Sequence, residues 1–294
     1  MAEKGAAVLR DFLRTKGYFD AFVDVIRDEH FNSITFQVTE GERVPLADIR
    51  FEGTKVFSAD ELTGVTKDCL SRFSSSKQGY DQEVLEYCLR NTSNFIRSQG
   101  YLQAKFGEHK IEVIGNGILA TVRVEEGSLY RLGKVEIEGA DRLSAEEIRT
   151  MLPLSEGEVA DAERISKWLF EDLKKTYGEL GHIEYTAEPV PEFRKVSEAE
   201  GVVDFKVTIE EGGRFTLRSL ELEGELLPTA KFINESPLQP GDVYKPSAYA
   251  AFITQLDQSG LFEPIDQDRD SDFRVDQEER VVSIRLKLRR RGSH

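Results

Sequence analysis

The residues in this chain that could do chemistry are its histidines, cysteines and carboxylates. The four histidines lie far apart, without the spacing of a metal site: His30, His109, His182 and His294. The 54 Asp and Glu residues are so numerous that no catalytic pair stands out, and most are expected on solvated faces. No phosphate-binding loop or nucleophile elbow is present, and the segment Gly115–Gly117 is typical of a hairpin turn. The sequence therefore predicts a protein that is not an enzyme and that uses no cofactor or metal.

The two cysteines, Cys69 and Cys88, each fall on one of two predicted helices that should be antiparallel neighbours. In an oxidising compartment a disulfide between them is permitted. Closing a loop of about 20 residues would contribute about 3 kcal/mol to stability. Two buried free thiols are the alternative, and the sequence alone favours it. Titration of free thiols under denaturant distinguishes these two states.

The charge balance limits the classes of partner. The chain of 294 residues has a formal net charge of −15, which argues against nucleic acid and against electrostatic docking on anionic lipid. No apolar run approaches the roughly 20 residues that span a bilayer, and the first residues lack the apolar region of a secretory signal. We expect residues 292–294 to be the remnant of an affinity tag.

One sequence pattern occurs three times along the chain: Val38–Gly53, Val124–Gly139 and Ile209–Gly224. Each copy has a Glu-Gly pair near its start and another at its end. The first glycines lie 86 residues apart from Gly41 to Gly127, and 85 apart from Gly127 to Gly212. A fixed period indicates a tandem array. Apolar and polar residues alternate on both sides of the first glycine, so each copy predicts a strand, a short link and a second strand.

Two helices are predicted between successive copies of the pattern. Ser58 and Ser144 each begin a capping box with a glutamate three residues later, which predicts the start of a first helix. Asp81 and Asp161 are the predicted N-caps of second helices. In the last unit the helices are expected near Thr229–Glu235 and at Pro246–Gln258. The glycines that end the second helices keep the same period: Gly17, Gly100, Gly181 and Gly260.

The remaining strands are predicted from alternating apolar residues bounded by turn residues. They are Tyr18–Ile26, Ser33–Glu40, Tyr101–Ile114, Ile118–Glu125, Ile183–Val190, Val202–Glu210, Leu261–Ile265 and Arg280–Leu288. Two long loops are expected, an acidic one at Pro189–Glu200 and a charged one at Asp266–Glu279. Each unit then has the order strand, helix, helix, strand, strand, and the two helices cover one face of its sheet.

The predicted boundaries follow the period. Residues 1–44 form a partial unit, a helix plus a β-hairpin, and the complete units are 45–130, 131–215 and 216–291. Because few residues separate the units, and several of these are apolar, we expect an elongated array with restricted joints. A scattering profile would test this expectation.

The repeated pattern, together with Ile96–Tyr101 at the end of a second helix, resembles POTRA domains, the polypeptide-transport-associated modules of the Omp85 family. The resemblance covers nearly the whole chain, as three complete units and one partial unit. It implies an α+β fold of tandem βααββ POTRA modules, each a three-stranded mixed sheet covered by two antiparallel helices. In this family the third strand is central and the second lies at an exposed edge.

The resemblance also implies a function. The chain would be the arm of an outer-membrane protein assembly factor at the periplasmic side of the outer membrane, followed by a C-terminal membrane β-barrel that is not in this chain. Its partners would be unfolded outer-membrane β-barrel proteins and accessory lipoproteins or chaperones, with no nucleic acid. The alternative is the POTRA region of a secretion transporter or of a division-type protein that binds one dedicated partner.

An exposed edge strand can bind an extended peptide because its N–H and C=O groups are unpaired. Proline removes a donor and blunts an edge, and prolines occur in Ile183–Val190 and in Leu261–Ile265. Tyr101–Ile114 contains none, so we predict the best peptide-binding edge there, with Tyr18–Ile26 second. The predicted binding residues are Tyr101, Leu102, Gln103, Ala104, Lys105 and Phe106, and then Tyr18, Phe19, Asp20 and Ala21.

Overall fold

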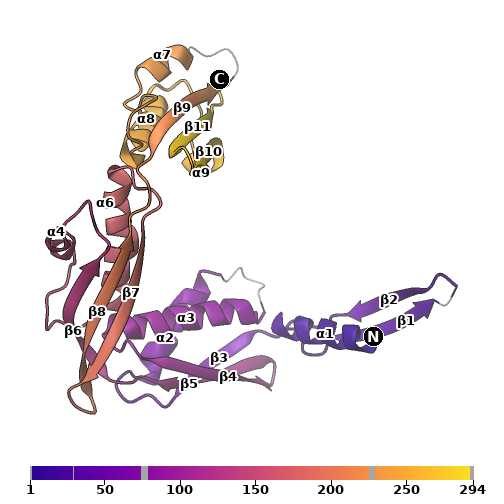
Figure 1. Cartoon of the computed structure of the whole chain (residues 1–294). Coiled ribbons are helices and arrows are strands. Elements are labelled where there is room, and N and C mark those ends of the chain that lie inside the picture. Colours follow the sequence, from indigo (N-terminus) through magenta and orange to yellow (C-terminus); the bar gives the residue numbers. More distant parts are fainter. Residues whose placement is uncertain (1, 29, 74–78, 225–228, 292–294) are drawn as a thin grey trace. The chain divides into compact units, whose positions relative to one another are not determined.

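The computed structural model describes residues 2–28, 30–73, 79–224 and 229–291 (Figure 1), and the expected tag remnant at 292–294 lies outside these ranges. The chain divides into two compact units. The first comprises Met1–Arg131, Glu158–Glu163 and Arg194–Val202. The second comprises Leu132–Gly157, Arg164–Phe193 and Val203–His294. Within the described ranges, no helix is both long enough and apolar enough to cross a membrane.

The chain begins with a helix and a β-hairpin, here called the N-terminal module: α1 (Ala2–Thr15), β1 (Phe22–Asp28) and β2 (Ser33–Thr39). β1 and β2 pair antiparallel along their whole length. The predicted strand Tyr18–Ile26 starts late, because residues 18–21 form a turn in which the Ala21 N–H donates to the Tyr18 carbonyl. Gly17, with a φ of 93°, makes the reversal that precedes this turn.

The cysteine module contains β3 (Leu46–Glu52), α2 (Ala59–Ser71), α3 (Gln82–Ser98), β4 (Lys105–Ile114) and β5 (Gly117–Glu125). β5 is the central strand, parallel to β3 and antiparallel to β4. Its inward side chains, Ile118, Ala120, Val122 and Val124, are buried in the core that also includes residues of α2 and α3. Both helices start where the sequence predicted, because Ser58 and Asp81 accept backbone N–H groups of the first turns.

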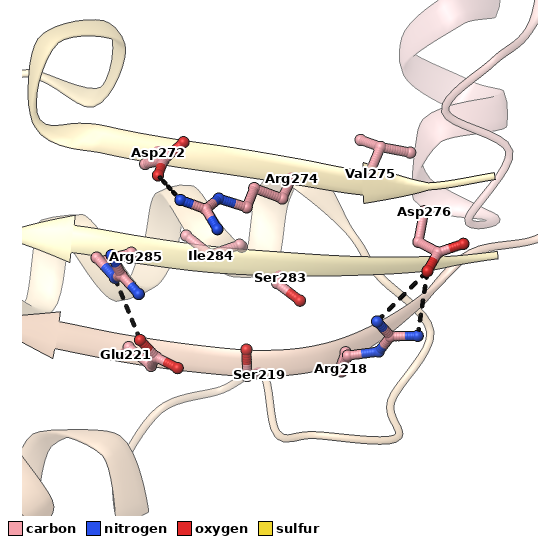
Figure 2. Close-up of a pocket in the computed structure, with 10 residues that line it drawn as sticks. All are labelled: Arg218, Ser219, Glu221, Asp272, Arg274, Val275, Asp276, Ser283, Ile284 and Arg285. Carbon is pink, nitrogen blue, oxygen red and sulfur yellow. Dashed lines mark hydrogen bonds and ion pairs between the residues drawn. The ribbon is translucent and has the colours of Figure 1, made fainter. Parts of the chain in front are cut away.

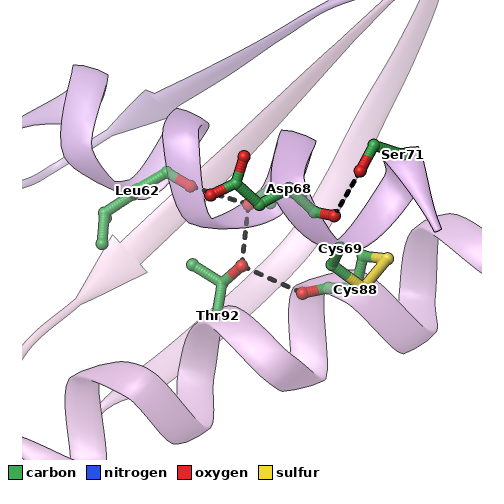
Figure 3. Close-up of a disulfide and its surroundings, with 7 residues drawn as sticks. Leu62, Asp68, Cys69, Ser71, Cys88 and Thr92 are labelled. Carbon is green, nitrogen blue, oxygen red and sulfur yellow. Dashed lines mark hydrogen bonds between the residues drawn. A yellow bond between two sulfur atoms is a disulfide. The ribbon is translucent and has the colours of Figure 1, made fainter.

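A disulfide joins α2 to α3, between Cys69 and Cys88 (Figure 3). One turn away, the hydroxyl oxygens of Thr66 and Thr92 lie 2.7 Å apart in the buried interface. The contacts pair residue 69 with 88 and residue 66 with 92, so the two helices run antiparallel. Both cysteines are buried, and the structure has the disulfide in place of the two free thiols that the sequence alone favoured.

The middle module contains β6 (Leu129–Glu138), α4 (Ala145–Thr150), α5 (Ala162–Lys167), the π-helical η1 (Trp168–Asp172), α6 (Leu173–Glu179), β7 (Thr186–Lys195) and β8 (Glu200–Glu210). Its strand order is β6-β8-β7. The predicted acidic loop Pro189–Glu200 is wrong, since β7 continues to Lys195. β7 is an edge strand, and Pro189 and Pro191 are two residues apart. Their backbone nitrogens therefore point to the same edge of the strand. This is the outer edge, where no neighbouring strand needs an N–H donor.

The C-terminal module contains β9 (Thr216–Glu223), α7 (Thr229–Asn234), α8 (Pro246–Gln258), α9 (Gln267–Asp270), β10 (Ser271–Asp276) and β11 (Val281–Lys287). β11 is central, parallel to β9 and antiparallel to β10. The predicted strand Leu261–Ile265 is wrong, and β10 lies in the stretch expected to be a charged loop. β10 is an edge strand with one face in solvent. Only two of its residues are apolar, Phe273 and Val275, and the charged residues around them made the stretch resemble a loop.

The same pair of backbone hydrogen bonds recurs at three links between modules. A link residue donates its N–H to the carbonyl of the glycine that ends a second helix, and its own carbonyl accepts an N–H from just before the next second helix. The link residues, with donor-acceptor distances to these two partners, are Val44 (Gly17, 2.9 Å; Tyr80, 2.7 Å), Tyr130 (Gly100, 2.9 Å; Ala160, 2.9 Å) and Phe215 (Gly181, 2.8 Å; Tyr244, 3.0 Å). The repeated sequence spacing therefore reflects a repeated joint.

The Glu-Gly pairs of the repeat recur because the glutamate accepts backbone N–H groups and the glycine fits where another residue would not. The buried carboxylate of Glu126 accepts the backbone N–H groups of residues 55–57 at 2.9–3.1 Å. The equivalent Glu211 accepts those of residues 141 and 142, both at 2.8 Å. Burial opposes the charge of Glu211, but these two donors hold its pKa below its ordinary value. A Cβ on Gly53 would lie 2.6 Å from the Val124 carbonyl oxygen, so this position needs glycine.

Candidate peptide-binding edge

Each three-stranded sheet has its second strand at an edge. The third strand is central in all three sheets, which gives the orders β3-β5-β4, β6-β8-β7 and β9-β11-β10. β4, β7 and β10 therefore have one row of backbone N–H and C=O groups that their own sheet leaves unpaired. Pro189 and Pro191 remove donors from β7, whereas β4 and β10 contain no proline. Among these three second strands, β4 and β10 thus keep every backbone donor along the free edge.

β4 contains a β-bulge that the sequence did not predict. Phe106 lies opposite Val124 of β5, but His109 lies opposite Val122, so the two residues between them share a single partner. Side chains alternate along a regular strand, which would put Phe106 and His109 on opposite faces. The extra residue of the bulge puts both on the face that α3 covers.

A groove of about 590 Å³ lies between α3 and the bulged half of β4. The residues that line it are Glu86, Leu89, Arg90, Ser93, Asn94 and Arg97 of α3, and Phe106, Gly107 and His109 of β4. Four of the α3 residues fall at positions i, i+4, i+7 and i+11, so they form one stripe along the helix. Leu89 and Phe106 add apolar surface. The groove can therefore hold both polar and apolar side chains of a bound segment.

The arginines of this groove are not neutralised by the protein. Within the part of the chain that the structure describes, Arg90 makes no ion pair or side-chain hydrogen bond. Arg97 donates from Nη2 to the carbonyl of Ala104 at 3.3 Å. Its buried Nε has no acceptor among the described residues. A guanidinium with unused donors is suited to a carboxylate or carbonyl oxygen.

The other half of β4, His109–Ile114, pairs with β5 without interruption up to the turn. Ile114 and Gly117 close a two-residue turn, so the backbone groups of residues 110, 112 and 114 face β5. Those of His109, Ile111 and Val113 face outward. β4 therefore offers three outward residues next to the groove.

The structure moves the predicted edge residues apart. Lys105 and Phe106 lie on β4, whereas Tyr101–Ala104 form the turn before it, closed by a 3.0 Å backbone hydrogen bond. In this turn the side chain of Gln103 accepts a hydrogen bond from the Tyr130 hydroxyl at 2.7 Å. The binding residues expected at Tyr101–Ala104 are thus part of a turn and not of a strand edge.

The second predicted group, Tyr18–Ala21, also lies outside a strand, in the turn before β1. The Phe19 and Tyr80 rings pack with centroids 6.0 Å apart. The Arg43 guanidinium lies 5.9 Å from the centre of the Tyr18 ring. These contacts use the predicted residues in the joint that follows the N-terminal module, and the expectation of a strand edge there is wrong.

The open face of the C-terminal sheet contains a pocket of about 350 Å³ (Figure 2). Its arginines pair with acids across or along the strands: Arg285 with Glu221 at 3.2 Å, Arg274 with Asp272 at 3.3 Å, and Arg218 with Asp276 at 3.4 Å. These groups neutralise one another. The pocket therefore lacks the unpaired positive charge that distinguishes the groove beside β4.

Two signals in the sequence could have indicated the groove. Polar residues recur along α3 from Glu86 to Arg97 at helical spacing, and Gly107 interrupts the alternation of β4. Neither signal shows which face the residues share, because that depends on the bulge and on the position of α3 over the sheet.

The fold and its edges define a class of protein built from βααββ modules, each with its second strand at a free edge. Residues 130–212 match the family model of POTRA, described as a surface antigen variable number repeat. The fold is similar to the solved structure of Haemophilus influenzae BamA POTRA3-5, with a TM-score of 0.64 at 19% identity, over 84% of this chain and 96% of that chain. The predicted α+β fold is confirmed.

Two relatives with curated names are similar to this chain in sequence. A Treponema pallidum (strain Nichols) protein whose name describes an outer membrane protein assembly factor is 26% identical over 230 residues, covering 76% of this chain and 27% of the relative. BamA of Neisseria meningitidis serogroup B is 22% identical over 199 residues, covering 65% and 24%. The chain spans about a quarter of the length of these two relatives. The resemblance of the sequence to POTRA domains of the Omp85 family is thus confirmed by the family match at residues 130–212, by the fold and by these relatives.

Proposed function

We propose that this chain is the periplasmic arm of an Omp85-type outer-membrane protein assembly factor, and that it works as a binding scaffold and not as an enzyme. It binds unfolded β-barrel precursors by adding an extended segment to an edge strand. Accessory lipoproteins or chaperones dock on the same arm, and a C-terminal membrane β-barrel completes the protein. The assembly-factor names of its relatives support this assignment.

The observation that carries the proposal is the free edge of β4 beside the α3 groove. The outward backbone groups of His109, Ile111 and Val113 can pair with a client strand, and the groove has room for client side chains. Main-chain pairing gives affinity without a fixed sequence. A factor that handles many β-barrel precursors needs this property, because its clients share strand structure and not sequence.

Site-specific crosslinking tests the choice of edge. A photoreactive amino acid is placed at Lys110 on β4, at Arg274 on β10 or at Glu188 on β7, three exposed positions. The probe is a urea-unfolded outer-membrane β-barrel protein diluted into the reaction. We expect the strongest labelling at Lys110 and the weakest at Glu188, where prolines remove donors. Strongest labelling at Glu188 would overturn the proposed edge.

A pair of substitutions on β4 tests the mode of binding. Val113→Pro removes an outward N–H, while Val113→Thr keeps it and keeps a β-branched side chain. We expect the proline variant to bind the probe about fivefold more weakly, the equivalent of one backbone hydrogen bond of about 1 kcal/mol. The threonine variant should bind like the wild type. Equal binding by both variants would argue against strand addition at β4.

A further inference from the structure

We infer that the groove between α3 and β4 selects client segments that carry a carboxylate, so that this edge recognises charge as well as backbone. The inference rests on the proposed strand addition at β4 and specifies its client class. That class is an extended segment in which an acidic residue is flanked, two positions away, by apolar residues.

Arg97 is the main evidence for a carboxylate. One arm of its guanidinium donates to the carbonyl of Ala104, which fixes the side chain at the start of β4. The buried Nε is left without an acceptor among the described residues. Nη1 also makes no hydrogen bond among the described residues, and unlike Nε it is not buried, so a ligand oxygen in the groove can accept from it. A carboxylate fits best, because its two oxygens match the parallel donors of a guanidinium.

The charges around Arg97 also favour an anion. The chain has a net charge of −15, yet this stripe of α3 carries two arginines, Arg90 and Arg97, seven residues apart. The acid on the same stripe, Glu86, lies eleven residues before Arg97, or about 16 Å along the helix. Its carboxylate already accepts a hydrogen bond from the Gln82 side chain at 2.7 Å. The Arg97 end of the groove is therefore locally positive.

The geometry of β4 determines which client positions meet this charge. A segment paired with His109, Ile111 and Val113 points every second side chain toward the groove. The bulge keeps Phe106 on the same face as His109, so the groove continues past the paired residues toward Arg97. Leu89 and Phe106 line it with apolar surface. Residues two positions from the bound acid should therefore be apolar.

Two capped nine-residue peptides test the inference. In the first, threonine alternates with valine, phenylalanine, glutamate and valine, and in the second, glutamine replaces the glutamate. Binding to the whole chain is measured by calorimetric titration, and amide shifts of β4 in NMR spectra locate the bound peptide. We expect the glutamate peptide to bind about tenfold more tightly at low salt, and this advantage to shrink as salt rises.

Variants of the chain identify the groups responsible. Arg97→Gln should abolish the preference for glutamate, whereas Arg218→Gln, in the ion-paired pocket of the C-terminal module, should leave it unchanged. Since Arg97 also bonds Ala104, Arg90→Gln provides a second variant that leaves this turn intact, and it should reduce the preference about threefold.

The outcomes separate this inference from the proposed function. Equal binding of both peptides at β4 of the wild-type chain would overturn charge selection and leave strand addition standing. A preference that survives in both the Arg97→Gln and Arg90→Gln variants would also overturn it. Failure of either peptide to bind at β4 would overturn the inference and the proposed edge together.

Discussion

The cysteine module and the C-terminal module have the same order of elements but are stabilised differently. Each has a central third strand, parallel to the first and antiparallel to the second. The cysteine module adds a disulfide between its helices, and the chain has only the two cysteines that form it. The C-terminal module has instead a buried acid, Asp270, held by two arginines. One fold is thus reinforced by a covalent bond between two helices in one module and by a buried ionic group in the other.

The two modules also use their surface arginines differently. In the pocket of the C-terminal sheet, Arg218, Arg274 and Arg285 each lie within 3.4 Å of an acid. In the groove of the cysteine module, Arg90 is unpaired and Arg97 has an unused donor within the described chain. The charge of a paired arginine is balanced by the protein itself. The C-terminal sheet thus has arginines that are already ion-paired, whereas the groove of the cysteine module keeps positive charge that a ligand could pair with.

The largest expected effect comes from removing the disulfide. Replacing both cysteines, Cys69→Ala with Cys88→Ala, should cost the cysteine module about 3 kcal/mol of stability, because a loop of about 20 residues regains its freedom in the unfolded state. Hydrogen exchange followed by mass spectrometry reports the modules separately. Amides of α2 and α3 should lose protection, while those of α8 should not.

Equal loss of protection in α8 would contradict this independence. Thiol titration supplies a direct control for the disulfide. The wild-type chain should show no reactive thiol under denaturant, and two reactive thiols would exclude the bridge.

The next effect concerns Asp270 and should be confined to the C-terminal module. This side chain is 5% exposed and accepts from Arg269 at 2.7 Å and Arg289 at 2.9 Å. Asp270→Asn should cost about 2 kcal/mol, because the buried asparagine keeps a single side-chain oxygen to accept from the two arginines and from the Asp266 N–H. In the same exchange experiment, protection should fall in α8 and remain unchanged in α3. Loss of protection in α3 instead would show that the modules are not stabilised independently.

The same carboxylate predicts how stability depends on pH. The hydrogen bond from Arg269 outweighs burial and holds the pKa of Asp270 well below its ordinary value of 3.8. Its stabilising effect is therefore complete above pH about 4 and is lost as the pH falls below that value. Unfolding of the C-terminal module, measured from pH 5 to pH 2 (roughly the range in which carboxylates titrate), should be less acid-sensitive in the Asp270→Asn variant.

The smallest expected effect is that of an exposed ion pair. Glu221→Gln removes the partner of Arg285, and both side chains are about half exposed, at 57% and 45%. The change should cost less than about 1 kcal/mol, because solvent screens the pair. A loss as large as that of Asp270→Asn would mean that the paired pocket stabilises the module more than its exposure indicates. Exchange of β9 and β11 amides measures the difference.

The sequence by itself determined the modules and much of their helices. The repeats around Gly41, Gly127 and Gly212 were readable because each of these glycines has a positive φ, which is a requirement of its own backbone. Helix starts at Ser58, Ser144 and Asp81 were readable for the same reason, because a cap acts within one turn of its own residue.

Only the tertiary structure decided which edge strand we propose for binding. The bulge in β4, the start of β4 at Lys105 and the position of β10 all depend on which residues a neighbouring strand pairs with. The groove depends on α3 lying over that bulge, and the disulfide depends on the packing of two helices. The spacing of residues along the chain does not show which strands pair or how the helices pack. They arise because a strand's two faces and two edges acquire different surroundings only when the sheet is assembled.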